Sequence, residues 1–170
     1  MPLTILHYPH EILTRRAAKV EIITPKLLQL AKCMAASMYN DRGIGLAAPQ
    51  VGHSIRLILV DISGPGKREE LLTLFNPEIH TSMGAVESEE GCLSVPNFRC
   101  NVDRAERITV RGQNQKGTIV TIDAEGLLAI CLQHEIDHLN GLLILDHASR
   151  LKRILYIGKI KKWQRKECNA

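Results

Sequence analysis

Long apolar runs are missing from this chain of 170 residues, and their absence excludes a membrane protein of the helical type. The longest uncharged apolar stretches, such as GLLAICLQ, are far shorter than the roughly 20 residues that span a bilayer. Residues 1–20 also lack the basic-then-apolar order and the small-residue cleavage site of a secretory signal. We therefore expect a cytoplasmic protein with no membrane segment.

Paired cysteines are missing as well. The chain has five cysteines, an odd number, and none of them are spaced as CxxC. Because thiols stay reduced in the cytosol, a disulfide framework is not expected, and a functional cysteine should act as a thiolate. There is no internal repeat, low-complexity linker or obvious boundary either, so we expect one domain over residues 1–170.

Charge is distributed unevenly along the sequence. Residues 150–170 contain eight basic residues and one acidic residue, a net charge of +7, whereas residues 1–149 contain 14 basic and 17 acidic residues, a net charge of −3. A basic tail of this kind can bind nucleic acid or another anionic surface, and it can equally be a solvated helix. Both interpretations stay open at this point.

Three segments are predicted to be helical. Thr24 is a suitable N-cap before a proline at the first helical position, and apolar residues recur at helical spacing up to Asp41. A second helix should run from about 125 to 140, with Gly141 at the left-handed position after its end. A third should cover about 148–165. Four of its apolar residues are expected to pack on the body of the protein: Leu151, Ile154, Leu155 and Ile157.

The middle of the chain is typical of β-structure. It is rich in Ile, Val, Leu and Thr, with Gly, Pro and Asn between the runs. The predicted strands are 55–62, 72–79, 84–95, 105–112 and 117–123. Strands in the middle with helices at both ends indicate an α+β fold. We expect antiparallel β-sheets packed around the second helix, with an N-terminal helix and a C-terminal helix.

The second predicted helix contains the segment HEIDH at 134–138. Side chains four residues apart lie on the same helix face, so His134 and His138 have the spacing at which two imidazoles bind one divalent metal. Glu135 flanks that position and can act as a general base toward a bound water. The motif therefore predicts a metal site on this helix.

A third ligand does not follow from this motif alone. The extension HExxHxxGxxH fails because Ile144 occupies its closing position. Cys131 lies about 10 Å from His138 along the helix axis, so it is expected to wall a pocket beside the metal. Cys92, in a bend after a glycine, could reach the helix from a neighbouring strand. Two further candidates are weaker: Asp146 and His147.

The loop GIGLAAPQVG at 43–52 resembles a dinucleotide-binding fingerprint but lacks its context. That fingerprint needs a strand before it and a helix after it, whereas here a helix precedes it and Pro49 follows. We therefore reject nucleotide binding. The small residues would let a backbone or a ligand come close, and Gln50 is the polar side chain of the loop.

Taken together, GIGLAAPQ at 43–50, EGCLS at 90–94 and HEIDH at 134–138 resemble the three signature motifs of bacterial peptide deformylases. The resemblance implies an enzyme that removes the formyl group from the amino-terminal formyl-methionine of new polypeptides and releases formate. It also implies Cys92, His134 and His138 as the metal ligands, with a fourth position left for water. One divalent ion is expected, naturally Fe²⁺, which Zn²⁺, Ni²⁺ or Co²⁺ can replace.

The resemblance also assigns roles around this ion. Glu135 would move the proton from water to the leaving amine, and Gln50 with the backbone N–H of Leu93 would stabilise the oxyanion. Residues expected to bind the peptide or its methionine side chain are Ile44, Gly45, Arg99, Leu127 and Cys131. The expected partners are formylmethionyl nascent peptides and, through the basic tail, the ribosome, with a monomer as the default state.

Two other functions remain to be excluded. A zinc endopeptidase of the HExxH type would use the same helix motif but cleave internal peptide bonds. A non-catalytic module associated with the ribosome or RNA would use the basic tail, with the metal as a structural element. A structural metal is usually enclosed by four protein ligands, and the sequence offers no obvious fourth.

Overall fold

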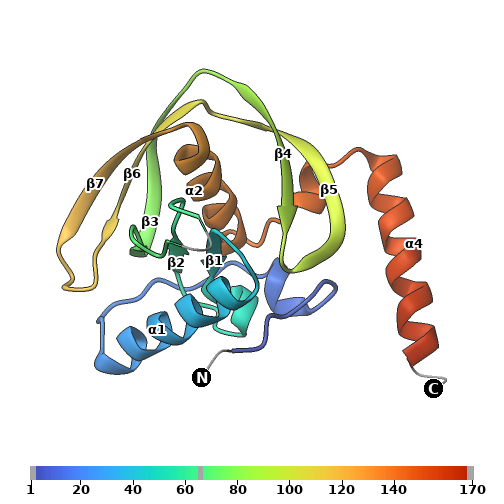
Figure 1. Cartoon of the computed structure of the whole chain (residues 1–170), viewed down its shortest axis with the longest axis horizontal. Helices are drawn as coiled ribbons and strands as arrows, with labels where there is room; N and C mark the ends of the chain where they lie inside the picture. Colours follow the sequence, from blue (N-terminus) through green and yellow to red (C-terminus); the bar gives the residue numbers. More distant parts are fainter. Residues whose placement is uncertain (1–2, 65–66, 168–170) are drawn as a thin grey trace.

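The computed structural model describes residues 3–64 and 67–167 (Figure 1). The first helix, α1 (Pro25–Asn40), begins as predicted: the Thr24 side chain accepts a hydrogen bond from the Leu27 N–H, and a proline occupies the first turn. Its apolar stripe is buried, including Met34 and Met38, and it packs against one side of the sheet described next.

The larger sheet has five strands in the order β1-β2-β3-β6-β7, and every neighbouring pair is antiparallel. Antiparallel pairing was expected, and so were four of these strands, although β3 is longer than predicted. The strands are β1 (Gly45–Ala47), β2 (Leu57–Val60), β3 (Leu72–Met83), β6 (Arg107–Gln113) and β7 (Ile119–Glu125). The short strand β1, predicted as loop, forms one edge of the sheet and leads into a 3-10 helix, η2 (Ala48–Val51).

The predicted single strand at 84–95 is wrong, because the structure has a hairpin there. Strand β4 (Val86–Cys92) turns at Leu93 and Ser94 into β5 (Val95–Arg104), and the two form a separate antiparallel sheet. Alternate residues of β5 are buried, the period of a half-buried strand. The proline at its second position and its polar outer residues disguised this pattern, although proline is tolerated near a strand end.

The second helix, α2 (Gly126–Leu139), lies in the middle of the molecule between the two sheets (Figure 1). Its apolar face packs on the five-stranded sheet, where Leu132 and Ile136 join Ile58 and Leu74 in one core cluster. Gly141 has φ +77° as predicted, the left-handed conformation that ends the helix. The expected arrangement of sheets around a central helix is confirmed.

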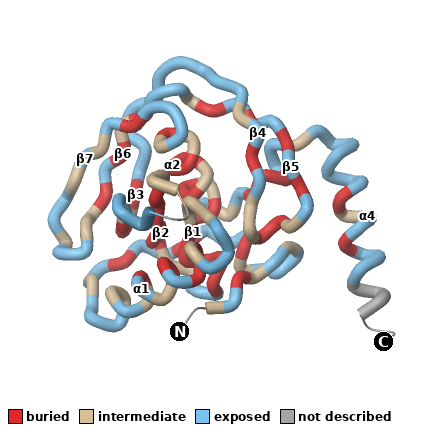
Figure 2. Tube along the Cα trace, in the orientation of Figure 1, coloured by how far each residue is buried: buried red, intermediate tan, exposed pale blue. Residues whose placement is uncertain are grey.

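The last helix was placed nearly correctly, but its packing was predicted wrongly. A short helix, α3 (Ile144–His147), precedes α4 (Arg150–Glu167), which stands at the side of the molecule next to β5 (Figure 1). Helix α4 is mostly exposed (Figure 2). It contacts the body of the protein through Tyr156 and Ile160. Three of the residues expected to pack are instead more than half exposed: Leu151, Ile154 and Leu155.

Within residues 3–64 and 67–167, no helix combines the length and the apolar character that a bilayer crossing requires. A further 3-10 helix, η1 (Glu11–Thr14), completes the elements of the described chain.

Candidate metal centre and active site

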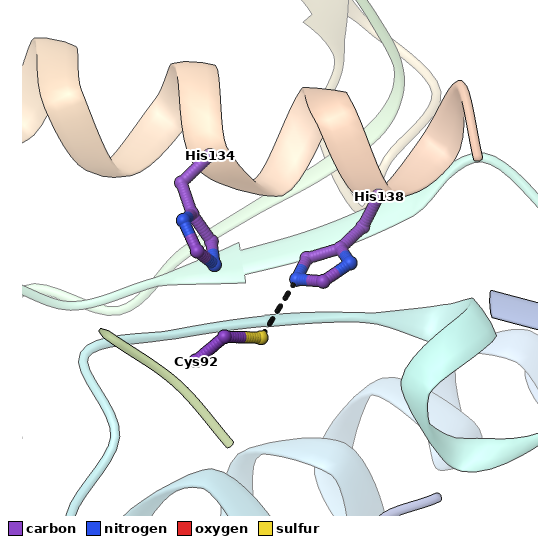
Figure 3. A group of neighbouring side chains, drawn as sticks. All are labelled: Cys92, His134 and His138. Atoms are coloured by element: carbon purple, nitrogen blue, oxygen red, sulfur yellow. Dashed lines mark hydrogen bonds between the residues drawn. The ribbon is translucent and has the colours of Figure 1, made fainter. Parts of the chain in front are cut away.

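Helix α2 and the end of strand β4 bring three metal-binding side chains together (Figure 3). His134 and His138 project from the same face of α2, and Cys92 faces them from the last position of β4. The Cys92 Sγ lies 3.2 Å from the His138 Nε2, and the ligand atoms of all three lie within 4.8 Å of one another. Among the candidates for the third ligand, Cys92 is therefore the one that joins the histidines.

The other candidates have different surroundings. The Nε2 of His147 lies 2.9 Å from the Oδ2 of Asp137, and the Oδ2 of Asp146 accepts a hydrogen bond from the Leu143 N–H. Cys131 is buried, one turn before His134 on α2, and its thiol donates weakly toward the Ile44 carbonyl at 3.6 Å. Cys131 therefore borders the site, as predicted, without joining the group of three.

The chemistry of the three donors fits a divalent metal ion. Ligands of a tetrahedral ion lie about 3.5 Å apart, close to the spacing of Cys92 and His138. Burial lowers the pKa of His138 well below its ordinary value, with help from the positive charges of His134 and Arg104. His138 is thus neutral, with its Nε2 lone pair available. Its buried Nδ1 has no hydrogen-bond partner within the described residues.

Glu90 holds the second histidine in place. Its Oε2 lies 2.9 Å from the Nδ1 of His134, so Glu90 holds the proton on Nδ1, and a metal that displaces the other proton would bind the Nε2 lone pair. Burial would raise the pKa of Glu90, but the hydrogen bonds from Arg104 and His134 outweigh it and bring that pKa to about 2. Glu90 is therefore ionised and a strong acceptor.

Arg104 connects this carboxylate to a second one. Its guanidinium donates from Nε and Nη2 to the two oxygens of Glu90, at 2.7 and 2.9 Å, and from Nη1 to the Oδ2 of Asp137 at 2.6 Å. Asp137 thus belongs to the groups that support the site. The roles of Glu90 and Arg104 were not predicted from the sequence. The one sequence signal was for Glu90, which is the first residue of the EGCLS motif.

Glu135 is buried beside the three donors, and its Oε2 has no hydrogen-bond partner in the described chain. Burial raises its pKa to about 7, even though the charge of His134 opposes this. Gly45 on β1 lies directly against it. A Cβ at position 45 would overlap the Glu135 Oε1 and come within 2.8 Å of both the Glu135 Cδ and the Cys131 Sγ, so any larger residue there would displace these side chains.

The side-chain amide of Gln50 is buried and lies near Cys92, one of the three metal donors. Its Oε1 accepts a hydrogen bond from the Ala47 N–H at 2.8 Å, which leaves Nε2 as the donor on the other side. That Nε2 lies 3.1 Å from the Ser94 Oγ and 3.6 Å from the Cys92 Sγ. Leu93, next to Cys92, is the first residue of the turn between β4 and β5.

These groups border one cavity of about 900 Å³. Every residue that the family resemblance assigned to the site lines this cavity, except His138. Those residues are Ile44, Gly45, Gln50, Cys92, Leu93, Arg99, Leu127, Cys131, His134 and Glu135. The lining also includes Arg42 and Phe98, which the sequence did not single out as site residues.

Three protein donors leave a coordination position open, which is typical of a catalytic and not a structural metal site. A buried carboxylate with a raised pKa and an amide donor border the same cavity and can serve proton transfer and oxyanion stabilisation. This fold and this site together define a metal-dependent hydrolase with a single metal centre.

Comparisons with known proteins identify the family. The profile of the polypeptide deformylase family matches residues 2–154. A peptide deformylase from Thermodesulfovibrio yellowstonii is 48% identical over 159 residues, which cover 94% of this chain and 96% of that protein. One from Hydrogenovibrio crunogenus is 46% identical over 168 residues, 99% of this chain and 98% of that protein. A crystal structure of a peptide deformylase from Legionella pneumophila has a TM-score of 0.91 at 45% identity, covering 100% of this chain and 99% of that one.

The chain belongs to the polypeptide deformylase family. It is a metalloenzyme that removes the N-formyl group from the amino-terminal formyl-methionine of newly synthesised polypeptides. The function implied by the three motifs is confirmed. The endopeptidase and the non-catalytic module are thereby excluded as its main function.

Proposed function

We propose that the deformylation reaction is carried by the residues around the cavity, within one domain that spans residues 1–170. The observation that carries this proposal is the convergence on one cavity of three metal donors, an oriented amide and a buried carboxylate whose Oε2 has no hydrogen-bond partner among the described residues. Cys92, His134 and His138 hold one divalent ion. When bound, this ion acts as a Lewis acid and lowers the pKa of water at its open position.

The resident ion is Fe²⁺ in this proposal. One thiolate and two imidazoles also suit Zn²⁺, Ni²⁺ and Co²⁺, so the donor set admits replacement. The choice of iron rests on the resemblance to bacterial peptide deformylases. Metal analysis of protein purified without oxygen tests it, and zinc at one equivalent with no iron would overturn it.

Glu135 transfers the proton. It takes a proton from the attacking water as the new C–O bond forms at the formyl carbon, and it delivers a proton to the amine nitrogen as the C–N bond breaks. The products are formate and a peptide with a free amino-terminal methionine. The pKa of about 7 supports this role, because a group that both accepts and donates a proton works best near the working pH.

Gln50 and Leu93 stabilise the negative charge that develops on the formyl oxygen. The buried amide of Gln50 already directs its Nε2 toward the Cys92 side of the cavity, so little reorganisation is needed. The N–H of Leu93, one residue after the proposed ligand Cys92, is the second donor. Such fixed donors act strongly in a site from which water is excluded.

The remaining lining residues bind the substrate. The backbone of Gly45 lies on the edge strand β1, so it can pair with an extended peptide. Arg99 lies opposite Gly91 across the hairpin, with its Cγ 3.7 Å from the position of a Cβ on Gly91, and helps to hold the peptide. The methionine side chain fits an apolar slot formed by Ile44, Leu127 and Cys131.

The test compares two acyl groups on one peptide. We expect formate from a formyl-Met tripeptide and no acetate from the acetylated tripeptide, because a small approach lined by glycine admits only the smallest acyl group. Glu135→Gln keeps the shape of the side chain but cannot accept the proton, so it should release formate at less than a hundredth of the wild-type rate. Wild-type activity in Glu135→Gln would refute the assigned role.

We also propose that the enzyme works as a cytoplasmic monomer and docks on the ribosome through α4. The helix carries exposed basic residues at Lys159, Lys161 and Lys162, next to the exposed apolar residues of its first turns. Ribosomal RNA is an anionic partner of matching charge. Self-association through this helix would place the same positive charges against each other, which supports a monomer.

Charge reversal tests the docking. Lys159, Lys161 and Lys162 changed to Glu should abolish co-sedimentation with ribosomes at low salt without affecting deformylation of a free peptide. A matched control changes three exposed lysines on the body of the protein: Lys26, Lys32 and Lys116. Co-sedimentation that survives in the α4 variant, or is lost equally in the control, would contradict docking through α4.

A further inference from the structure

Ser94 is a fully buried hydroxyl with an unusual environment. It lies in the turn between β4 and β5, is 0% exposed, and is not one of the groups to which a part in the reaction has been assigned. Within the described residues, its Oγ makes a single hydrogen bond, which it accepts from the Gln50 Nε2 at 3.1 Å. Burying a hydroxyl is costly unless it is hydrogen-bonded, so the contact with Gln50 offsets part of that cost.

The orientation of the Gln50 amide depends on two neighbours. The Ala47 N–H can only donate, so the group that faces it at 2.8 Å must be the amide oxygen. This contact fixes which end of the amide is Nε2 but leaves the amide plane free to rock about it. The Ser94 Oγ accepts one of the two Nε2 protons and removes that freedom.

Because the amide group is planar, the direction of the second Nε2 proton is fixed once the first one is bonded to Ser94. The other neighbour of Nε2 is the Cys92 Sγ, 3.6 Å away, which accepts a hydrogen bond from it but is a weak acceptor. The second N–H is therefore aimed at the metal side of the cavity without being tightly bound there. This is what a donor to a developing oxyanion requires, since it must be oriented before the reaction and still available.

We propose that Ser94 is a positioning residue for deformylation: it fixes the plane of the Gln50 amide, so that the free N–H meets the oxyanion. The proposal rests on the role proposed above for Gln50. Ser94 does not itself touch the substrate. Its loss therefore weakens transition-state stabilisation through Gln50 and leaves substrate binding unchanged.

A double-mutant cycle on the metal-loaded enzyme tests this coupling. Ser94→Ala should lower kcat about fivefold, the effect of one neutral hydrogen bond, with KM within twofold of wild type. Gln50→Ala should lower kcat about 100-fold. In the Gln50→Ala background, Ser94→Ala should change kcat by less than about 1.5-fold, because the group that it orients is gone. An equal loss in both backgrounds, or a change in KM alone, would overturn the proposal.

A matched control separates this effect from general destabilisation. Ser37 on α1 is also a buried serine, bonded to the backbone of Leu3 and Cys33 and not part of the cavity lining. Ser37→Ala should leave kcat and KM within twofold of wild type. If Ser94→Ala folds poorly, Ser94→Cys keeps the shape and a weak acceptor, and its kcat should lie between those of wild type and Ser94→Ala.

A second readout does not depend on activity. In zinc-loaded, ¹⁵N-labelled enzyme, the Gln50 side-chain amide can be assigned by its loss in Gln50→Ala. Its protons should exchange with water at least several-fold faster in Ser94→Ala than in wild type or Ser37→Ala. Unchanged exchange would show that Ser94 does not hold the amide. A fully active Gln50→Ala enzyme would refute the role of Gln50 instead, and the exchange measurement would still decide whether Ser94 orients it.

Discussion

The contact between Gly45 and Glu135 allows the sharpest prediction about catalysis. A Cβ at position 45 would overlap the Oε1 of Glu135 and come within 2.8 Å of its Cδ. Since carbon atoms in contact lie about 3.5–4.0 Å apart, the carboxylate of a Gly45→Ala variant must move by about 1 Å. The new methyl group cannot avoid the carboxylate by shifting toward Cys131, because the Cys131 Sγ would also lie 2.8 Å from it.

A displacement of about 1 Å in a reacting group costs about 100-fold in rate, or roughly 2.7 kcal/mol of transition-state stabilisation. We therefore expect Gly45→Ala to lower kcat/KM for a formyl-Met tripeptide by about 100-fold. Formate release measures this directly. The three proposed metal ligands are not touched, so the metal content should stay at that of wild type.

Gly158→Ala is the matched control. A Cβ at position 158 meets no atom of the described residues within 4 Å, and Gly158 lies on α4, outside the cavity lining. Its activity should equal that of wild type, and its stability should rise by up to about 1 kcal/mol because alanine favours the helix. If Gly45→Ala kept kcat/KM within threefold of wild type, the claim that catalysis depends on the space that Gly45 leaves for the Glu135 carboxylate would be wrong.

Three further variants test the support of the site. Glu90→Gln replaces the ionised acceptor of the His134 N–H and should weaken metal affinity about 10- to 100-fold, as measured by competition with a chelator; unchanged affinity would contradict the role of Glu90. Arg104→Met leaves the buried carboxylate of Glu90 and the half-buried one of Asp137 without their shared guanidinium, and should reduce the free energy of unfolding by about 3–5 kcal/mol in urea titrations, whereas a loss below 1 kcal/mol would count against the network. Tyr156→Phe removes the hydrogen bond from its hydroxyl to the Pro96 carbonyl, at 3.0 Å, and should cost about 1 kcal/mol with full activity on a free peptide; reduced activity would mean that α4 supports the cavity.

Local patterns predicted the helices well because their signals lie within a few residues. The cap at Thr24, the left-handed Gly141 and the pairing of His134 with His138 on one face each depend on short spacings. The same reasoning failed on α4. A helix pattern shows which residues are apolar, but the contact of Tyr156 and Ile160 with the body depends on where the helix docks.

The parts of the site that escaped prediction depend on contacts between distant segments. Cys92 and His138 are 46 residues apart, and no local pattern decides between Cys92 and the other candidate ligands. The resemblance to a known family supplied that choice. Glu90 and Arg104 look like ordinary exposed charges of a strand. Their burial as a pair follows only when the β4–β5 hairpin packs on α2, and the hairpin itself was missed.

The most direct test of the account is to follow metal content and formate release together on one sample of enzyme purified without oxygen. We predict one ion per chain and formate from the formyl-Met tripeptide, loss of both on chelation, and recovery of both when Fe²⁺ is added back. Cys92→Ala, treated in the same way, should recover neither. Full formate release from a sample that holds less than a tenth of an ion per chain would contradict the claim that a metal in this site is required for the reaction.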